Sequence, residues 1–95
     1  MGDMSIDGRP LERIIKGFAN HRRLAILMLL KKKPELSVAE IARDFSANYE
    51  NTSDHIRKLA IAGLVLKRYQ GKEVRHKITE RAEAVLAFCK GLSEK

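Results

Sequence analysis

The sequence has few of the features that mark secreted or membrane proteins. One cysteine, Cys89, occurs in 95 residues. No disulfide can therefore form within one chain, which is typical of the cytoplasm. The longest apolar run, Leu24–Leu30, is far shorter than the about 20 residues needed to cross a bilayer. Residues Met1–Pro10 are polar and do not resemble a signal peptide. We expect a soluble, cytoplasmic protein with no membrane partner.

The residues needed for catalysis or for metal binding are also scarce. No nucleophile, base and orienting group occur in a recognisable pattern, and no glycine-rich phosphate loop is present, so we expect no enzyme. Zinc and soft metals need three or four converging nitrogen or sulfur ligands. His21, His55, His76 and Cys89 are scattered, so we expect no metal and no cofactor. Cys89 is typical of a small buried residue, although near a dimer axis it could cross-link two chains.

Positive charge is the most prominent feature of the composition. The formal net charge is +7 and the isoelectric point is near 9.9. Such a surface attracts nucleic acid, acidic lipid or an acidic protein, and the sign alone does not choose among them. The length suits one domain, which we place at residues 10–95 after a loose tail at residues 1–9.

Two amphipathic or apolar helices are predicted in the first third of the chain. Pro10 suits a first helical turn, and an apolar stripe follows at Leu11, Ile14, Ile15 and Phe18. Asn20 is a suitable cap for a second helix, which is apolar almost all round over Leu24–Leu30 and stops at Pro34. Lys31–Lys33 solvates the end of this helix or, alternatively, binds phosphate.

A pair of short helices is predicted next. Ser37 and Glu40 have the spacing of a capping box, and Leu36–Ser37 could form a very short strand. The following helix begins at the Asn48 cap and ends at Gly63. The inward residues of the two helices are Val38, Ile41, Ala42 and Phe45, and Thr52, Ile56, Leu59 and Ala60. Two such helices packed on a third form a helix-turn-helix.

The rest of the chain predicts a hairpin and a last helix. Leu64–Tyr69 and Glu73–Ile78 are rich in strand-forming residues, and Gln70–Lys72 provides the turn. Thr79 caps a helix over Glu80–Leu92. The predicted fold is mainly α with a small β-hairpin, a winged helix-turn-helix.

Three segments resemble the ArsR/SmtB-type winged-helix repressors. They read F-A-N-H-R-R-L-A-I-L-M-L-L, L-S-V-A-E-I-A-R-D-F and S-D-H-I-R-K-L-A-I-A-G-L-V. The resemblance extends from about Leu11 to Leu92. It implies a homodimeric repressor that inserts helix 48–62 into the major groove of double-stranded DNA and lays the 64–78 wing along the backbone. Metal-sensing members carry cysteines where this chain reads E-L-S-V-A-E, which argues against metal sensing.

The resemblance also suggests that the first and last helices form the dimer interface. In so small a chain their apolar faces cannot all be buried in one core. The alternative is that they pack only on each other within one chain. The expected interface residues are Leu11, Ile14, Ile15, Phe18, Val85, Phe88, Cys89 and Leu92.

The candidate DNA contacts fall into two groups. Lys67–Arg81 holds six basic and two acidic residues, and phosphates supply most nonspecific affinity whereas bases supply specificity. For backbone contacts we predict Arg68, Lys72, Arg75 and His76 in the wing. For the recognition helix we predict Asn48, Tyr49, Glu50, Ser53, Asp54 and Arg57.

The acids on this helix leave the function open to a second interpretation. Glu50 and Asp54 could accept from a cytosine amino group, interact locally with Lys58 and the helix dipole, or weaken DNA binding. A winged helix that binds a basic protein is therefore the alternative. Salt-sensitive binding to duplex DNA separates the two functions.

Overall fold

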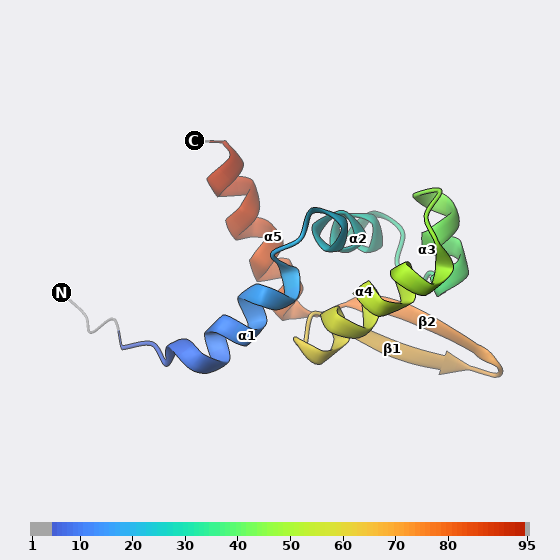
Figure 1. The fold of residues 1–95 in the computed structure, drawn as a ribbon, viewed down its shortest axis with the longest axis horizontal. Helices are drawn as coiled ribbons and strands as arrows, with labels where there is room; N and C mark the ends of the chain where they lie inside the picture. The colour runs from blue at the N-terminus through green and yellow to red at the C-terminus, as the bar shows by residue number, and fades with distance from the viewer. Residues whose placement is uncertain (1–4, 95) are drawn as a thin grey trace.

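The computed structural model of the protein describes residues 5–94 and has the predicted winged helix-turn-helix architecture (Figure 1). No helix within those residues is both long enough and apolar enough to span a membrane. The described part of the chain forms five helices and two strands, in the order α1 (Gly8–Phe18), α2 (His21–Lys32), α3 (Val38–Asp44), α4 (Tyr49–Ile61), β1 (Val65–Gln70), β2 (Glu73–Ile78) and α5 (Glu80–Ser93).

Helix α2 is the centre of the core, as its apolar sequence predicted. Ile26, Leu27 and Leu30 are almost fully buried. They pack with residues of α3, α4, the hairpin base and α5, namely Ile41, Ile56, Leu59, Leu64, Val65 and Ala82. Of the residues predicted to face inward on α3 and α4, Ile41, Ile56 and Leu59 lie in this core and Val38 and Phe45 pack against it. Ala42 and Thr52 are also buried, whereas Ala60 is only half-buried. Helices α3 and α4 are thus fixed to α2 as a helix-turn-helix.

Side-chain caps set where the helices begin. The Asn20 oxygen accepts from the N–H groups of Arg22 and Arg23 at 2.9 and 3.0 Å. Both halves of the Ser37–Glu40 capping box are present. Helix α1 begins at Gly8 rather than Pro10, because the Asp7 carboxylate accepts the Arg9 N–H at 3.1 Å. Residues 1–4 of the expected tail lie outside the described residues.

The two strands form an antiparallel hairpin with Val65 opposite Ile78 and Gln70 opposite Glu73. Its turn contains Gly71 at φ +62°, a conformation that favours glycine. Leu36 adds a single bridge to His76 on the outer edge of β2, which confirms the very short strand expected there. The wing therefore has a third, minimal strand that ties it to the loop between α2 and α3.

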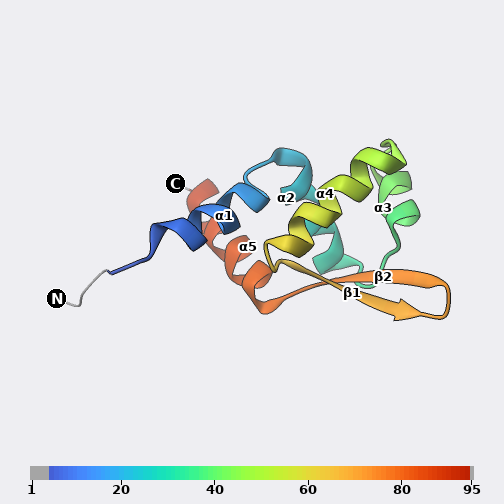
Figure 2. The ribbon, with the colours of Figure 1, turned by 60° about the horizontal axis from the view of Figure 1, so that its bottom comes forward.

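The terminal helices project from this body (Figures 1 and 2). Helix α1 packs against α2 and α4, whereas α5 packs against α2 and β2, so they do not pack only on each other. Helix α1 has no buried residue, and Phe88 and Leu92 of α5 are 63% and 60% exposed. The radius of gyration is 14.3 Å, against about 12 Å for a compact chain of this length. The chain alone leaves apolar helix faces uncovered.

Candidate nucleic-acid interface

Helix α4 has one face in the core and one face in solvent. Thr52, Ile56 and Leu59 are buried, and the Thr52 hydroxyl donates to the Asn48 carbonyl at 2.8 Å. Ile61 on the opposite face is 74% exposed, and Tyr49 at the N-terminal end of the helix is 56% exposed. In Figure 2 α4 crosses in front of α2, with α3 beside its N-terminal end and the wing below it. A helix in this position can enter a groove of a macromolecule without moving the core.

At the N-terminal end of α4, Asn48 caps the helix, whereas several of the residues that follow it are exposed or half-buried. The Asn48 side-chain oxygen accepts the Asn51 N–H at 3.0 Å, so the cap occupies this oxygen. Tyr49 and Glu50 are exposed, and Ser53 is half-buried. Within residues 5–94 Glu50 forms no ion pair. The exposed Tyr49 and Glu50 are therefore free to meet a partner.

Asp54 is the centre of a local charge cluster on α4. Its carboxylate lies 2.5 Å from Arg57 Nη2 and 3.2 Å from Lys58 Nζ. The hydrogen bond from Arg57, followed by that from Lys58, lowers the pKa of Asp54. The local ion pair with Lys58 anticipated from the sequence is thus present, and Arg57 joins it. Asp54 therefore offsets part of the positive charge of both cations in the unbound protein.

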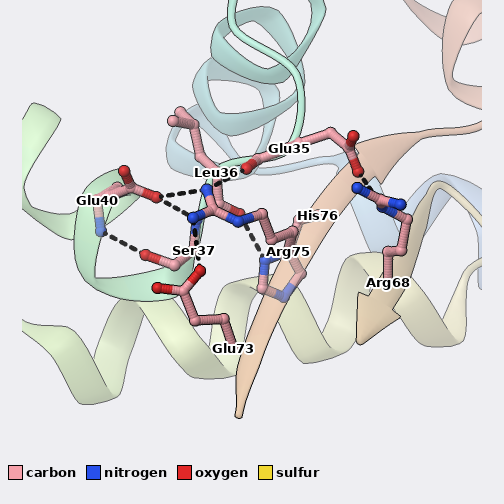
Figure 3. Close-up of polar contacts among 8 residues, drawn as sticks. All are labelled: Glu35, Leu36, Ser37, Glu40, Arg68, Glu73, Arg75 and His76. Atoms are coloured by element: carbon pink, nitrogen blue, oxygen red, sulfur yellow. Dashed lines mark hydrogen bonds and ion pairs between the residues drawn. The ribbon is translucent and has the colours of Figure 1, made fainter. Parts of the chain in front are cut away.

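The wing is fastened to α3 and its preceding loop by a cluster of charged side chains, drawn in Figure 3. We call this cluster the wing clamp; it consists of Glu35, Glu40, Arg68, Glu73 and Arg75. Arg68 Nε donates to the Glu35 carboxylate at 2.6 Å. Arg75 donates to the Glu35 carbonyl at 2.9 Å, to Glu73 at 2.6 Å and to Glu40 at 3.4 Å.

The backbone conformation at Glu35 lets its N–H, its carbonyl and its carboxylate all reach the wing. Its φ is +67°, which is uncommon for a residue other than glycine. The Glu35 N–H donates to the His76 carbonyl at 2.9 Å, and the His76 N–H donates to the Leu36 carbonyl at 3.0 Å. This ladder holds the loop along β2 and directs the Glu35 carboxylate toward Arg68.

Hydrogen bonds favour the charged forms of two clamp residues, Glu40 and Arg75. The Ser37 N–H and hydroxyl lower the pKa of Glu40, with a further contribution from Arg75. Glu73 is the main cause of the raised pKa of Arg75. The two wing arginines predicted to bind the backbone are therefore already paired with carboxylates in the unbound protein.

The prediction that His76 contacts the DNA backbone is wrong. His76 is 1% exposed and its Nδ1 lies 2.9 Å from the Leu36 carbonyl oxygen. Burial lowers its pKa, so the neutral imidazole is favoured. Lys67, Lys72 and Lys77 are exposed instead, and none forms an ion pair within the part of the chain that is described. These lysines are the uncommitted cations of the wing.

No group of three or more His, Cys, Asp or Glu residues in the described chain could hold a metal ion. Cys89 is half-buried. His55 is half-buried, and burial followed by the charge of Arg23 lowers its pKa. Glu35 and Glu40 were missed as partners of the wing because they lie 33 and 35 residues from Arg68 and Arg75 in the sequence.

Comparison with known proteins gives consistent matches. Residues 20–67 match the family described as bacterial regulatory protein, arsR family. The arsenical resistance operon repressor of Escherichia coli K12 is 31% identical over 72 residues, which are 76% of this chain and 62% of that protein. The chain thus spans less than two-thirds of the length of this curated relative.

Two solved structures are similar over nearly the whole chain. One is the homodimeric winged helix-turn-helix DNA-binding domain of a possible ArsR-family transcriptional regulator from Mycobacterium bovis, with a TM-score of 0.84 and 28% identity over 99% of this chain and 91% of that one. The other is HlyU from Vibrio cholerae, with a TM-score of 0.79 and 27% identity over 97% of this chain and 100% of that one.

Proposed function

This chain belongs to the ArsR family of winged helix-turn-helix transcriptional regulators, which are not enzymes, and we propose that it is a dimeric, sequence-specific DNA-binding repressor. The observation that carries the proposal is the solvent-exposed face of α4 beside a wing that carries free lysines. The Escherichia coli relative is named as a repressor, which supports this direction of regulation. The proposed compartment is the cytoplasm, where DNA is accessible.

Binding in the proposed complex divides between two elements. The major groove is about 12 Å wide and admits an α-helix, so α4 enters it with Tyr49, Glu50, Ser53, Asp54 and Arg57 toward the bases. Lys72 and the arginines of the wing clamp lie along the sugar-phosphate backbone. Occupation of an operator by such a protein blocks transcription without any chemical step.

The proposed dimer is formed by α1 and α5 of two chains. Support comes from the exposure of Leu11, Ile15, Phe88 and Leu92, which are 37%, 43%, 63% and 60% exposed, and from the homodimer described for the Mycobacterium bovis domain. Contiguous exposed apolar faces mark association sites. Ile14 and Phe18 extend this face on α1, and Val85 and Cys89 extend it on α5, each half-buried in the single chain.

Selection of bound sequences from random duplexes tests the proposal. We expect two related half-sites whose centres lie about 34 Å apart, one turn of DNA, and binding that weakens steeply with salt. A folded dimer that binds no duplex in a salt-sensitive manner would contradict the DNA-binding function and favour a protein-interaction module.

Sedimentation tests the dimer separately. Phe88→Asp should give a folded monomer at concentrations where the wild type is dimeric, because it places a charge in the apolar face. Leu66→Asp is the matched control, since Leu66 is similarly exposed at 60% but lies in the wing. Equal dissociation of both variants would contradict the assignment of α1 and α5.

A further inference from the structure

A second basic site lies at the end of α4 opposite the wing tip. A surface groove runs between α1 and the C-terminal end of α4, and Arg23 of α2 and Arg81 of α5 also line it. Among residues 5–94, no acidic residue lines it. Five cationic residues do, namely Arg13, Lys16, Arg23, Lys58 and Arg81.

Close packing fixes the shape of this groove. Gly17 of α1 crosses α4 at Ala62, and a Cβ added to Gly17 would lie 2.5 Å from the Ala62 Cβ. Glycine is therefore required for this helix crossing. Arg81 forms part of the wall, where its guanidinium donates to the Ala62 carbonyl at 2.9 Å. The cations are held on a rigid frame rather than on a mobile loop.

The cations of the groove are less neutralised than those of the wing. Arg13 forms no ion pair within residues 5–94, and Arg23 Nε is buried there without a hydrogen-bond partner. Of the five groove cations, Lys16 and Lys58 alone have acidic partners in the described part of the chain, Glu12 at 2.7 Å and Asp54 at 3.2 Å. The groove thus has five cations against two acids. The wing has five cations, Lys67, Arg68, Lys72, Arg75 and Lys77, against the three acids of the clamp.

The position of the groove relative to α4 indicates its ligand. Helix α4 has 13 residues and is therefore about 20 Å long. Its N-terminal end lies toward α3 and the wing tip, and its C-terminal end lies against α1 (Figures 1 and 2). A helix in a major groove about 12 Å wide has a phosphate backbone on either side. One anchor at each end of α4 could hold both backbones.

We propose that the groove between α1 and α4 binds a backbone phosphate of the same DNA that α4 enters. This proposal rests on the proposed function and adds a second anchor to it. Arg13 and Arg23 supply the phosphate contact, while Lys58 joins them after it exchanges Asp54 for the phosphate. Arg81 keeps its structural bond to α4.

Salt titration of Arg13→Gln and Arg23→Gln tests the site on the duplex selected by the wild type. For each lost contact we expect the slope of log affinity against log salt to fall in magnitude by roughly 0.9, equally on specific and random duplexes. Lys90→Gln is the matched control, because Lys90 is an exposed cation of α5 that does not line this groove. Arg23 is half-buried, so Arg23→Gln could unfold the protein. Arg13 is exposed, so Arg13→Gln should keep the fold and still test the site.

Methylphosphonate substitution identifies the contacted phosphate. Neutralising one backbone position should weaken the wild type but leave Arg13→Gln unaffected. The proposal is overturned if Arg13→Gln has the same salt slope as Lys90→Gln. It is also overturned if every methylphosphonate position that weakens the wild type weakens Arg13→Gln as well. Either result leaves the DNA-binding function intact. Binding of inorganic phosphate that Arg13→Gln abolishes without a change of slope also overturns the proposal. A wild type without salt-sensitive DNA binding refutes the proposed function itself.

Discussion

Replacement of Glu35 by glutamine should release Arg68 from the wing clamp and strengthen DNA binding. In the unbound protein the Glu35 carboxylate lies 2.6 Å from Arg68 Nε, where it offsets the charge of Arg68 and competes with a phosphate for its guanidinium. Glutamine keeps the size of the side chain and removes its charge. The Glu35 carbonyl, which accepts from Arg75 at 2.9 Å, belongs to the backbone and remains in place.

The magnitude follows from counterion release. Each phosphate contact contributes a slope of roughly 0.9 in log affinity against log salt, which corresponds to roughly fivefold in affinity at about 0.15 M salt. The Arg68 and Glu35 side chains are 57% and 36% exposed, so water already screens their attraction. We therefore expect up to about a fivefold gain in affinity, a steeper slope and little change in thermal stability.

Fluorescence anisotropy over a range of salt concentrations measures both quantities. Glu83→Gln is the matched control, since Glu83 forms an equally short 2.6 Å pair with Lys31 between α5 and α2 rather than with the wing. Equal gains in affinity for both variants would show that the effect comes from the change in net charge and not from the release of Arg68. A loss of affinity in Glu35→Gln would refute the displacement reasoning and indicate that Glu35 orients Arg68 toward DNA.

Three further predictions concern α4, the groove and the buried histidine. Asp54→Asn should raise affinity for random duplexes more than for the selected one, measured by anisotropy, because it frees Arg57 and Lys58 but removes a base contact; an unchanged ratio would contradict the base contact and leave Asp54 only a local role. Gly17→Ala should lower the free energy of unfolding by about 1–3 kcal/mol through overpacking, whereas Gly91→Ala, with open space around its Cβ, should not; equal denaturation midpoints would refute the close crossing. Burial lowers the pKa of His76, so stability should be full above the unfolded-state value of about 6.5 and fall as pH drops toward the lowered pKa. His76→Gln should flatten this loss in denaturant titrations, and an equally steep loss would exclude His76 as its source.

Local sequence signals were sufficient for most of the fold. Caps at Asn20, Ser37, Asn48 and Thr79 fall where predicted because each depends on bonds within a few residues. The end of α4 was predictable for the same reason, since Gly63 takes φ +74° there. The start of α1 was missed because Asp7 and Pro10 both suit a helix terminus, and the sequence does not rank them.

The burial of His76 could have been predicted from the alternation of side chains along the strand. Val74, His76 and Ile78 share one face of β2, because side chains alternate between the faces of a strand. The apolar neighbours turn that face toward the core, and all three residues are buried or half-buried. The basic character of the segment concealed this pattern, since Arg75 and Lys77 flank the histidine in the sequence.

The wing clamp and the basic groove could not be predicted in this way. Glu35 and Arg68 are 33 residues apart in the sequence. The positive φ of Glu35 was also unpredictable, because glycine is the residue that usually indicates such a conformation. The groove depends on Gly17 meeting Ala62, which only the helix crossing creates. Charge counting over a contiguous stretch assigned the positive field to the wing because it could not include acids contributed from elsewhere in the fold.

Charge and exposure along α4 separate affinity from specificity. On the helix itself Glu50 and Asp54 offset Arg57 and Lys58, so α4 has little net attraction for phosphate. The uncommitted cations lie beyond its two ends, as lysines in the wing and arginines in the groove. Because phosphates carry no sequence information and base edges do, substitutions at Tyr49 or Glu50 should change the selected sequence while leaving the salt slope nearly constant. Loss of cations at either end should do the reverse, weakening binding to every duplex without changing which is preferred.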